Sequence, residues 1–160
     1  MAALEPGRTF PKIVLSDSAY NPAPAPAGET LYAFFKTTCP TTKMSWPYLE
    51  RIRRIADGGD LSILAVSQDD AVETEAFNRR LGIHVKTLYD LPPWRASDAL
   101  GLTSVPAFIL VDRQGVVRDG AVGFQKQKME AFAARAAELA GRAAEPLFRS
   151  GESVPAIKPG

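Results

Sequence analysis

The chain has 160 residues, of which 46% are apolar and 23% are charged, and 19 Lys and Arg residues nearly balance 18 Asp and Glu residues. The length and the apolar content predict one folded domain with a hydrophobic core and exclude a highly charged disordered chain. The net charge of +1 provides no bulk attraction to nucleic acid or anionic lipid, so neither is an expected partner.

The lengths of the apolar runs and the single Cys and His residues exclude further classes of protein. The longest apolar runs, at 31–35 and 105–111, are far below the roughly 20 residues that span a bilayer, and the first residues do not resemble a secretory signal. We therefore expect no membrane insertion and a cytoplasmic location, unless a presequence has been removed. Cys39 and His84 are single occurrences, so no internal disulfide and no four-ligand zinc site is possible. No metal or other cofactor is predicted, and His84 is expected to be structural or solvated.

Strand and helix patterns alternate along the chain. Short apolar runs predict strands, whereas periodic apolar positions with capping residues predict helices. In chain order we expect an edge strand at 12–16, strands at 30–36, 61–66, 85–89, 107–111 and 116–118, and helices at 40–56, 71–81, 96–100 and 128–144. This order predicts an α/β fold with helices on both faces of the sheet.

The domain limits follow from proline and turn residues. We assign residues 1–145 to one domain, with a proline-rich surface connection at 21–28, and residues 146–160 to an extended tail that contains three prolines. The helix after Cys39 is expected to bury one apolar stripe, formed by Met44, Tyr48, Ile52 and Ile55.

Cys39 is the candidate for chemistry. It lies where a predicted buried strand meets a helix, and Pro40 suits the first helical position because its missing N–H has no partner there in any case. Unpaired N–H groups and the positive end of the helix dipole favour a thiolate, which is the nucleophilic form of cysteine. The alternative is that Cys39 is a buried, inert apolar residue, since free cysteines are often buried.

Two segments resemble the thioredoxin-fold superfamily. Residues 34–42, Phe-Phe-Lys-Thr-Thr-Cys-Pro-Thr-Thr, resemble its active-site turn, and residues 105–112, Val-Pro-Ala-Phe-Ile-Leu-Val-Asp, with Gly115 after them, resemble its cis-proline strand and hairpin. The resemblance covers about residues 10–142. It is greatest to bacterial thioredoxin-like thiol:disulfide reductases and to the alkyl hydroperoxide reductase/thiol-specific antioxidant group, also called redoxins. It implies a three-layer sandwich with a central mixed β-sheet.

The resemblance also implies a role for individual residues. Cys39 matches the attacking cysteine, Pro106 the cis-proline beside it, and Val105 the residue whose backbone pairs with a substrate peptide. Thr42 matches the position of the second, resolving cysteine and is counted with the catalytic residues. The substrate-binding residues implied in this way are Thr38, Pro40, Thr41 and Val105.

Several positions depart from the family pattern. Thr42 replaces the second cysteine, Thr38 stands where many relatives have Trp, and Ala33 stands where thioredoxins carry a buried acid. The residues that activate peroxide in peroxiredoxins would fall on Tyr32 and Lys36, which do not match.

These departures lead to a hypothesis of function with two alternatives. We expect a thiol-dependent oxidoreductase that forms mixed disulfides through Cys39 with protein or glutathione substrates and needs an external thiol for release. The alternatives are a redox-inactive or sensing binding protein of this fold and a one-cysteine peroxidase. It also stays open whether Thr42 replaces a natural cysteine. The sequence does not predict an oligomeric state.

Overall fold

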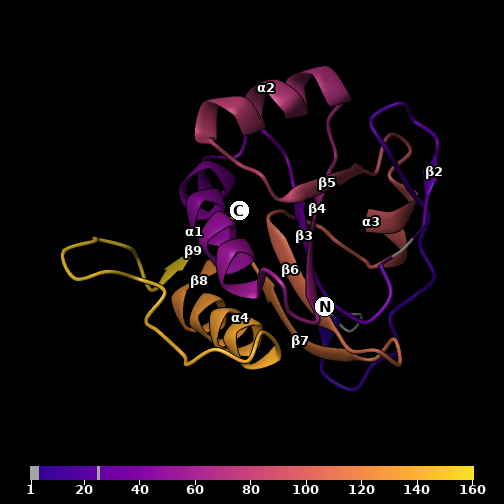
Figure 1. Cartoon of the computed structure of the whole chain (residues 1–160). Helices are drawn as coiled ribbons and strands as arrows, with labels where there is room; N and C mark the ends of the chain where they lie inside the picture. Colours follow the sequence, from indigo (N-terminus) through magenta and orange to yellow (C-terminus); the bar gives the residue numbers. More distant parts are fainter. Residues whose placement is uncertain (1–3, 25) are drawn as a thin grey trace.

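The computed structural model describes residues 4–24 and 26–160, and its centre is a seven-stranded sheet in the order β2-β1-β5-β4-β3-β6-β7 (Figure 1). Residues 1–3, at the start of the predicted domain, and residue 25, in the predicted proline-rich connection, lie outside the described residues. The strands of the sheet are β1 (Leu15–Ser16), β2 (Pro22–Ala23), β3 (Glu29–Phe35), β4 (Leu61–Ser67), β5 (Lys86–Tyr89), β6 (Ala107–Val111) and β7 (Val117–Val122).

The sheet is mixed, and helices lie on both of its faces. Strands β3, β4 and β5 run parallel to one another, whereas β6 pairs antiparallel with β3 and β7 pairs antiparallel with β6. The helices are α1 (Pro40–Ala56), α2 (Ala71–Leu81), α3 (Arg95–Ala99) and α4 (Lys126–Leu139). Figure 1 shows α1 and α4 on one side of the sheet and α3 on the other. The predicted α/β sandwich is thereby confirmed.

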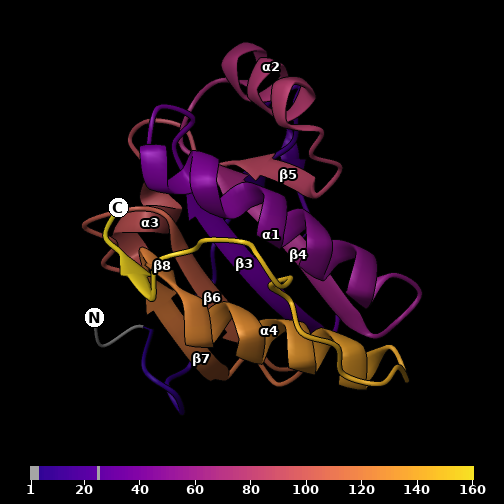
Figure 2. The same cartoon turned by 90° about the vertical axis from the view of Figure 1, so that its left-hand side faces the viewer.

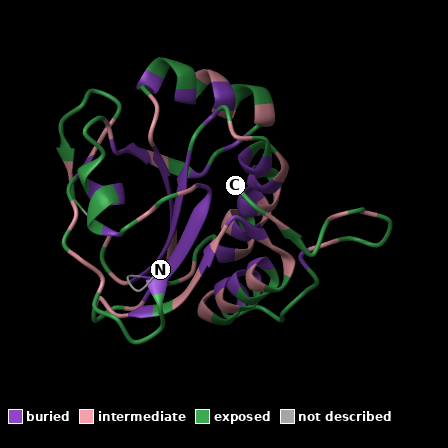
Figure 3. Cartoon of the chain, turned by 180° about the vertical axis from the view of Figure 1, so that it is seen from behind, coloured by how far each residue is buried: buried purple, intermediate pink, exposed green. Residues whose placement is uncertain are grey.

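Alternation along β3 explains why the sheet has a core on each side. Successive side chains of a strand point to opposite faces. Leu31, Ala33 and Phe35 belong to the core under α1 and α4, whereas Tyr32 and Phe34 belong to the core on the side of α3. All seven residues of β3 are buried, as expected for a strand covered on both faces (Figure 3).

The buried face of α1 differs from the predicted stripe. Trp46, Leu49 and Ile52 are fully buried, whereas Met44, Tyr48 and Ile55 are only partly buried at its side. The prediction was wrong because α1 carries two neighbouring apolar stripes, and the one predicted as core is largely the flank. The ring of Tyr48, for example, lies 4.7 Å from that of Phe148 in the tail.

Other boundaries also differ from the predictions. Strand β1 is not at the edge of the sheet, because β2 covers it and β1 itself pairs with β5. Helix α4 ends at Leu139, well before the predicted end at residue 144, and Gly141 adopts a positive φ just after it. Strand β7 extends to Val122, four residues beyond the predicted end of the hairpin.

Residues 146–160 return to the body of the molecule. The tail passes along α1 and α4 and ends near the start of α1 (Figure 2). Leu147 is buried, and Arg51 of α1 donates two hydrogen bonds to the carboxylate of Glu152 at 2.7 Å each. Further along, β9 (Ile157–Lys158) pairs antiparallel with β8 (Phe124–Gln125). Within the described residues, the helices are too short or too polar to cross a bilayer.

Candidate functional site

Cys39 is the N-terminal cap residue of α1, one turn after the end of β3. Its backbone is extended (φ −76°, ψ 121°), its carbonyl accepts from Lys43 N–H at 3.1 Å, and Pro40 occupies the first helical position. The side chain itself makes no capping hydrogen bond. The sulfur therefore sits at the N-terminal end of a 17-residue helix, beside its unpaired backbone N–H groups and the positive end of its dipole.

The sulfur of Cys39 meets the backbone of Val105. The thiol donates to the Val105 carbonyl oxygen at 3.6 Å, and the Val105–Pro106 peptide bond is cis. The topology explains this contact, because Phe34 of β3 pairs with Ala107 of β6. The residues that follow β3 and those that precede β6 consequently lie at the same end of the sheet.

The loop before Cys39 is held by the end of β4. Asp69 accepts a hydrogen bond from the Thr37 backbone N–H at 2.7 Å, and Thr37 is buried. Asp69 N–H in turn donates to the Ser67 hydroxyl at 3.1 Å, which also contacts the Thr74 hydroxyl at 2.7 Å. The loop that leads into Cys39 is thus held by a hydrogen bond to Asp69, just after β4, and Asp69 is itself linked through Ser67 to α2.

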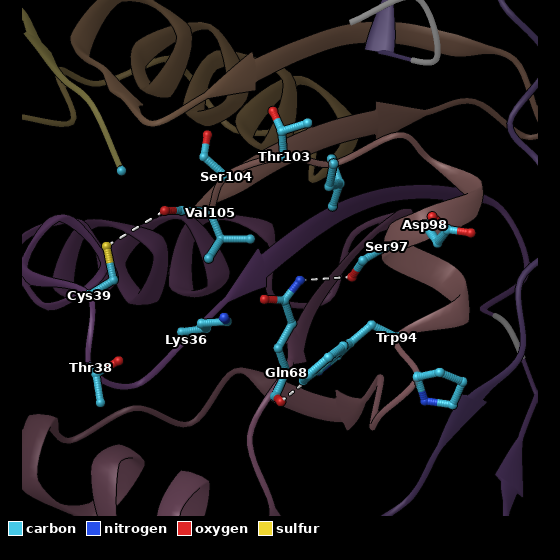
Figure 4. Close-up of a pocket in the computed structure, with 13 residues that line it drawn as sticks. Lys36, Thr38, Cys39, Gln68, Trp94, Ser97, Asp98, Thr103, Ser104 and Val105 are labelled. Carbon is cyan, nitrogen blue, oxygen red and sulfur yellow. Dashed lines mark hydrogen bonds between the residues drawn. The ribbon is translucent and has the colours of Figure 1, made fainter.

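A pocket of about 480 Å³ opens beside Cys39. This volume lies in the range of small-molecule sites. Figure 4 shows Cys39 directed at the Val105 carbonyl, with the other lining side chains contributed by several separate elements. The lining residues are Lys36, Thr38, Cys39, Gln68, Pro93, Trp94, Ser97, Asp98, Leu102, Thr103, Ser104, Val105 and Gly160.

One wall of the pocket is built around Trp94. Its indole N–H donates to the Gln68 carbonyl at 3.1 Å, and the Lys36 ammonium lies 5.8 Å from the centre of its ring. The Gln68 amide donates to the Ser97 hydroxyl at 2.8 Å, and that hydroxyl donates to the buried Asp90 carboxylate at 2.6 Å. The pocket therefore has an aromatic face, formed by Trp94, and a positive charge, carried by Lys36, near Cys39.

The predicted site residues fall into two groups. Thr38, Cys39 and Val105 line the pocket, and Pro40 and Pro106 adjoin them in the chain.

Thr41 and Thr42 are buried instead. The Thr41 hydroxyl donates to the Pro159 carbonyl at 2.6 Å, whereas the Thr42 hydroxyl has no hydrogen-bond partner within the described part of the chain. The Thr42 hydroxyl therefore forms no hydrogen bond with the cysteine sulfur.

Three parts of the site were not predicted as functional. Asp69 has the sequence pattern of a helix-capping residue. In the structure Asp70 caps α2, whereas Asp69 accepts a hydrogen bond from the Thr37 backbone N–H. Trp94 and Gln68 together form one wall of the pocket. Gly160 arrives from the tail, for which the sequence pattern gave no signal.

Other charged groups do not build a metal centre. Among residues 4–24 and 26–160, no three His, Cys, Asp or Glu side chains are gathered as metal ligands would be. The His84 side chain is 74% exposed, and its Nδ1 lies 3.5 Å from the Glu50 carboxylate.

Several solved structures have the same fold as this chain. A proposed protein disulfide isomerase from Bacteroides thetaiotaomicron superposes with a TM-score of 0.74 at 13% identity, covering 87% of this chain and 92% of that one. A proposed thiol:disulfide interchange protein DsbE from Chlorobium tepidum gives 0.68 at 20% identity, over 84% and 98%. The thioredoxin domain of a thiol-disulfide oxidoreductase from Bacteroides vulgatus gives 0.67 at 18% identity, over 76% and 91%.

At these identities the structural matches show the fold alone. Comparison with curated proteins found no match. The sequence profile of the Redoxin family matches residues 5–137, a range that includes both Cys39 and the Val105–Pro106 segment. The chain therefore belongs to the Redoxin family.

Proposed function

We propose that the protein is a thiol-dependent oxidoreductase whose single nucleophile is Cys39. The observation that carries this proposal is the position of the sulfur, which lies at the N-terminus of α1, against Val105 and at the wall of an open pocket. A reactive cysteine needs partial exposure and a positive environment. Cys39 is half-buried, and the exposed Lys36 lines the same pocket.

The chemistry is thiol–disulfide exchange in two steps. The Cys39 thiolate attacks one sulfur of a substrate disulfide, so that a Cys39 mixed disulfide forms and the other substrate sulfur leaves as a thiolate. An external thiolate, such as that of glutathione, then attacks the substrate sulfur of the mixed disulfide and restores the Cys39 thiolate. The thiol that carries out the second step must come from another molecule, because Thr42, one turn after Cys39, carries a hydroxyl in place of a thiol.

The neighbouring residues have supporting roles in this proposal. Val105 and Pro106 form the surface against which the substrate sulfur lies, and Thr38 and Pro40 border the approach to Cys39. Protein disulfides and glutathione disulfide are the proposed substrates.

Mass spectrometry after incubation with oxidised glutathione tests the proposal. We expect one glutathionyl group per chain, removal of that group by added glutathione, and no adduct on the Cys39→Ser variant. Consumption of the thiol within seconds by stoichiometric hydrogen peroxide, without exchange, would instead identify a one-cysteine peroxidase. A thiol that reacts with neither reagent would identify a binding protein.

A further inference from the structure

The last residues of the described chain lie directly beside Cys39. Lys126 N–H donates to the Ala156 carbonyl at 2.9 Å, β9 pairs with β8, and the Thr41 hydroxyl holds the Pro159 carbonyl at 2.6 Å. Gly160 then lines the same pocket wall as Cys39 and Val105. Residues 157–160, which we call the tail cover, are thus fixed at successive positions from β8 to the start of α1 (Figure 2).

Two glycines make this close approach possible. A β-carbon on residue 160 would lie 1.9 Å from the Val105 carbonyl oxygen and 2.6 Å from its carbon, far inside any permitted contact. A β-carbon on Gly123 would lie 2.8 Å from the Lys158 carbonyl oxygen. The backbone of residue 160 therefore rests on the Val105 peptide itself, the group whose oxygen accepts from Cys39.

This contact covers the Val105 side of the sulfur. An extended peptide that presents its disulfide to Cys39 passes over the Val105 backbone, the natural edge for main-chain hydrogen bonds. Gly160 occupies that edge. The pocket that Gly160 borders, whose other lining residues include Lys36, Gln68 and Trp94, stays open and is large enough for a small molecule.

We propose that the tail cover competes with peptide substrates for the Val105 edge, so that Cys39 exchanges with small disulfides while the cover is docked and with extended peptide disulfides when it is displaced. A segment tethered to the same chain competes at an effective concentration of the order of millimolar, so weakly binding peptides do not displace it. The cover takes no part in bond making. This inference rests on the thiol–disulfide exchange proposed above.

The Gly160→Val variant tests the cover directly, because its side chain has no room at the Val105 carbonyl. A second variant ends the chain at Ala156 and removes the cover altogether. Ser153→Val serves as the matched control, since it adds a β-branched side chain at an exposed position of the same tail. For each protein we would measure the rate of exchange with oxidised glutathione and with a disulfide-linked extended peptide.

The expected result is a change in the ratio of these two rates. Gly160→Val and the shortened chain should raise the peptide rate about tenfold or more, as expected for removal of a tethered competitor. The peptide rate should rise relative to the glutathione rate in both tail variants, and Ser153→Val should match the parent protein in both rates. An unchanged ratio in both tail variants would overturn the proposal.

Alkylation rates of Cys39 test the tail cover independently of the proposed disulfide exchange. The same variants are treated with iodoacetamide and with a maleimide carried on a peptide, reagents that need no disulfide chemistry. A raised ratio of peptide-maleimide to iodoacetamide rates, with no disulfide exchange in any variant, would support the cover and reject the oxidoreductase function. An unchanged alkylation ratio would reject the cover alone.

Discussion

The sulfur of Cys39 lies 3.6 Å from the carbonyl oxygen of Val105, although 66 positions separate the two residues in the chain. The contact depends on the antiparallel pairing of β3 with β6, which brings both residues to one end of the sheet. It also depends on the loop that precedes α1, which the end of β4 holds in place through Asp69.

Thr42→Cys is predicted to create an internal disulfide with Cys39. The two positions are three apart at the start of α1, so their side chains lie on one face of the helix within reach of a bridge. The variant should form the disulfide under mild oxidation, and its reduced form should release both thiols of one substrate disulfide per chain, with no added thiol, as its own two cysteines are oxidised to the bridge.

Ser45→Cys is the matched control for that experiment. It introduces a second buried cysteine on the same helix, but six positions from Cys39, which is too far for a bridge. If Thr42→Cys forms no more internal disulfide than Ser45→Cys, position 42 is not equivalent to that of a resolving cysteine.

Asp69→Ala is predicted to impair Cys39 by releasing the loop before it. The change leaves the buried Thr37 N–H without its acceptor, which should lower the free energy of unfolding by about 2 kcal/mol. Exchange of Cys39 with oxidised glutathione should slow about tenfold, because small misplacements of reacting groups are costly. Asp69→Asn keeps an acceptor oxygen and should recover most of that rate.

Asp70→Ala separates positioning from stability. Asp70 caps α2 by accepting from Glu73 N–H at 2.8 Å, so its loss should cost about 1 kcal/mol. The exchange rate of Cys39 should stay at the parent value in this control. A rate in Asp69→Ala equal to that of Asp70→Ala would show that Asp69 does not position the cysteine.

The main strands and helices were predictable because their signals are local. The run at 31–35 is continuously apolar or aromatic, and such runs are typical of strands buried on both faces. Asp70 and Gly82 marked the start and end of α2 through a side-chain cap and a positive φ. The position of the candidate site was predictable for the same reason, because the Cys-Pro pair at the start of α1 is also a local signal.

The other features of the fold and of the candidate site depend on contacts between distant parts of the chain, which local sequence patterns do not encode. Helix α1 has two apolar stripes, and only the arrival of Phe148 from the tail determines that Tyr48 belongs to the flank. The tail itself carries no strong periodicity, so neither β9 nor the contact of Gly160 with Val105 could be inferred. Glu50 is a further case, because charged residues are seldom buried unless they are paired.

Glu50→Leu is predicted to destabilise the fold. The carboxylate is 2% exposed and accepts from the backbone N–H groups of His84 and Val85 at 2.8 and 3.1 Å while pairing with Arg53 at 2.7 Å. Loss of these bonds should lower the free energy of unfolding by about 3 kcal/mol in urea denaturation at pH 7. Glu130→Leu, at an exposed position of α4, should change it by less than about 0.5 kcal/mol.

The pH dependence of the same variant provides a second check. Burial acts to raise the pKa of Glu50, but hydrogen bonds from Arg53 and from the His84 backbone outweigh it, and the net pKa lies below the ordinary value of 4.5. The stability that the carboxylate contributes is therefore present above pH 4.5 and is lost as the pH falls through the lower folded-state value. A stability difference between parent and Glu50→Leu that grows on acidification would contradict this assignment.

Glu152→Gln is predicted to loosen the tail. Hydrogen bonds from the Arg51 guanidinium and from the Arg149 backbone N–H hold the pKa of Glu152 to about 2. Loss of the charge should speed hydrogen exchange of the Lys126 amide, which donates to Ala156. The difference from the parent should be constant above about pH 4.5 and should shrink as the pH falls toward about 2. Equal exchange rates at neutral pH would show that this ion pair does not hold the tail.

The dependence of turnover on an external thiol tests the single-cysteine mechanism most directly. We would follow reduction of a small disulfide by the purified protein with and without glutathione, and with the Cys39→Ser variant as control. The account predicts one mixed disulfide per chain and no further reaction without glutathione, steady turnover when it is present, and no reaction of Cys39→Ser. Release of the bound substrate sulfur from the mixed disulfide without any added thiol, or reaction of Cys39→Ser, would contradict it.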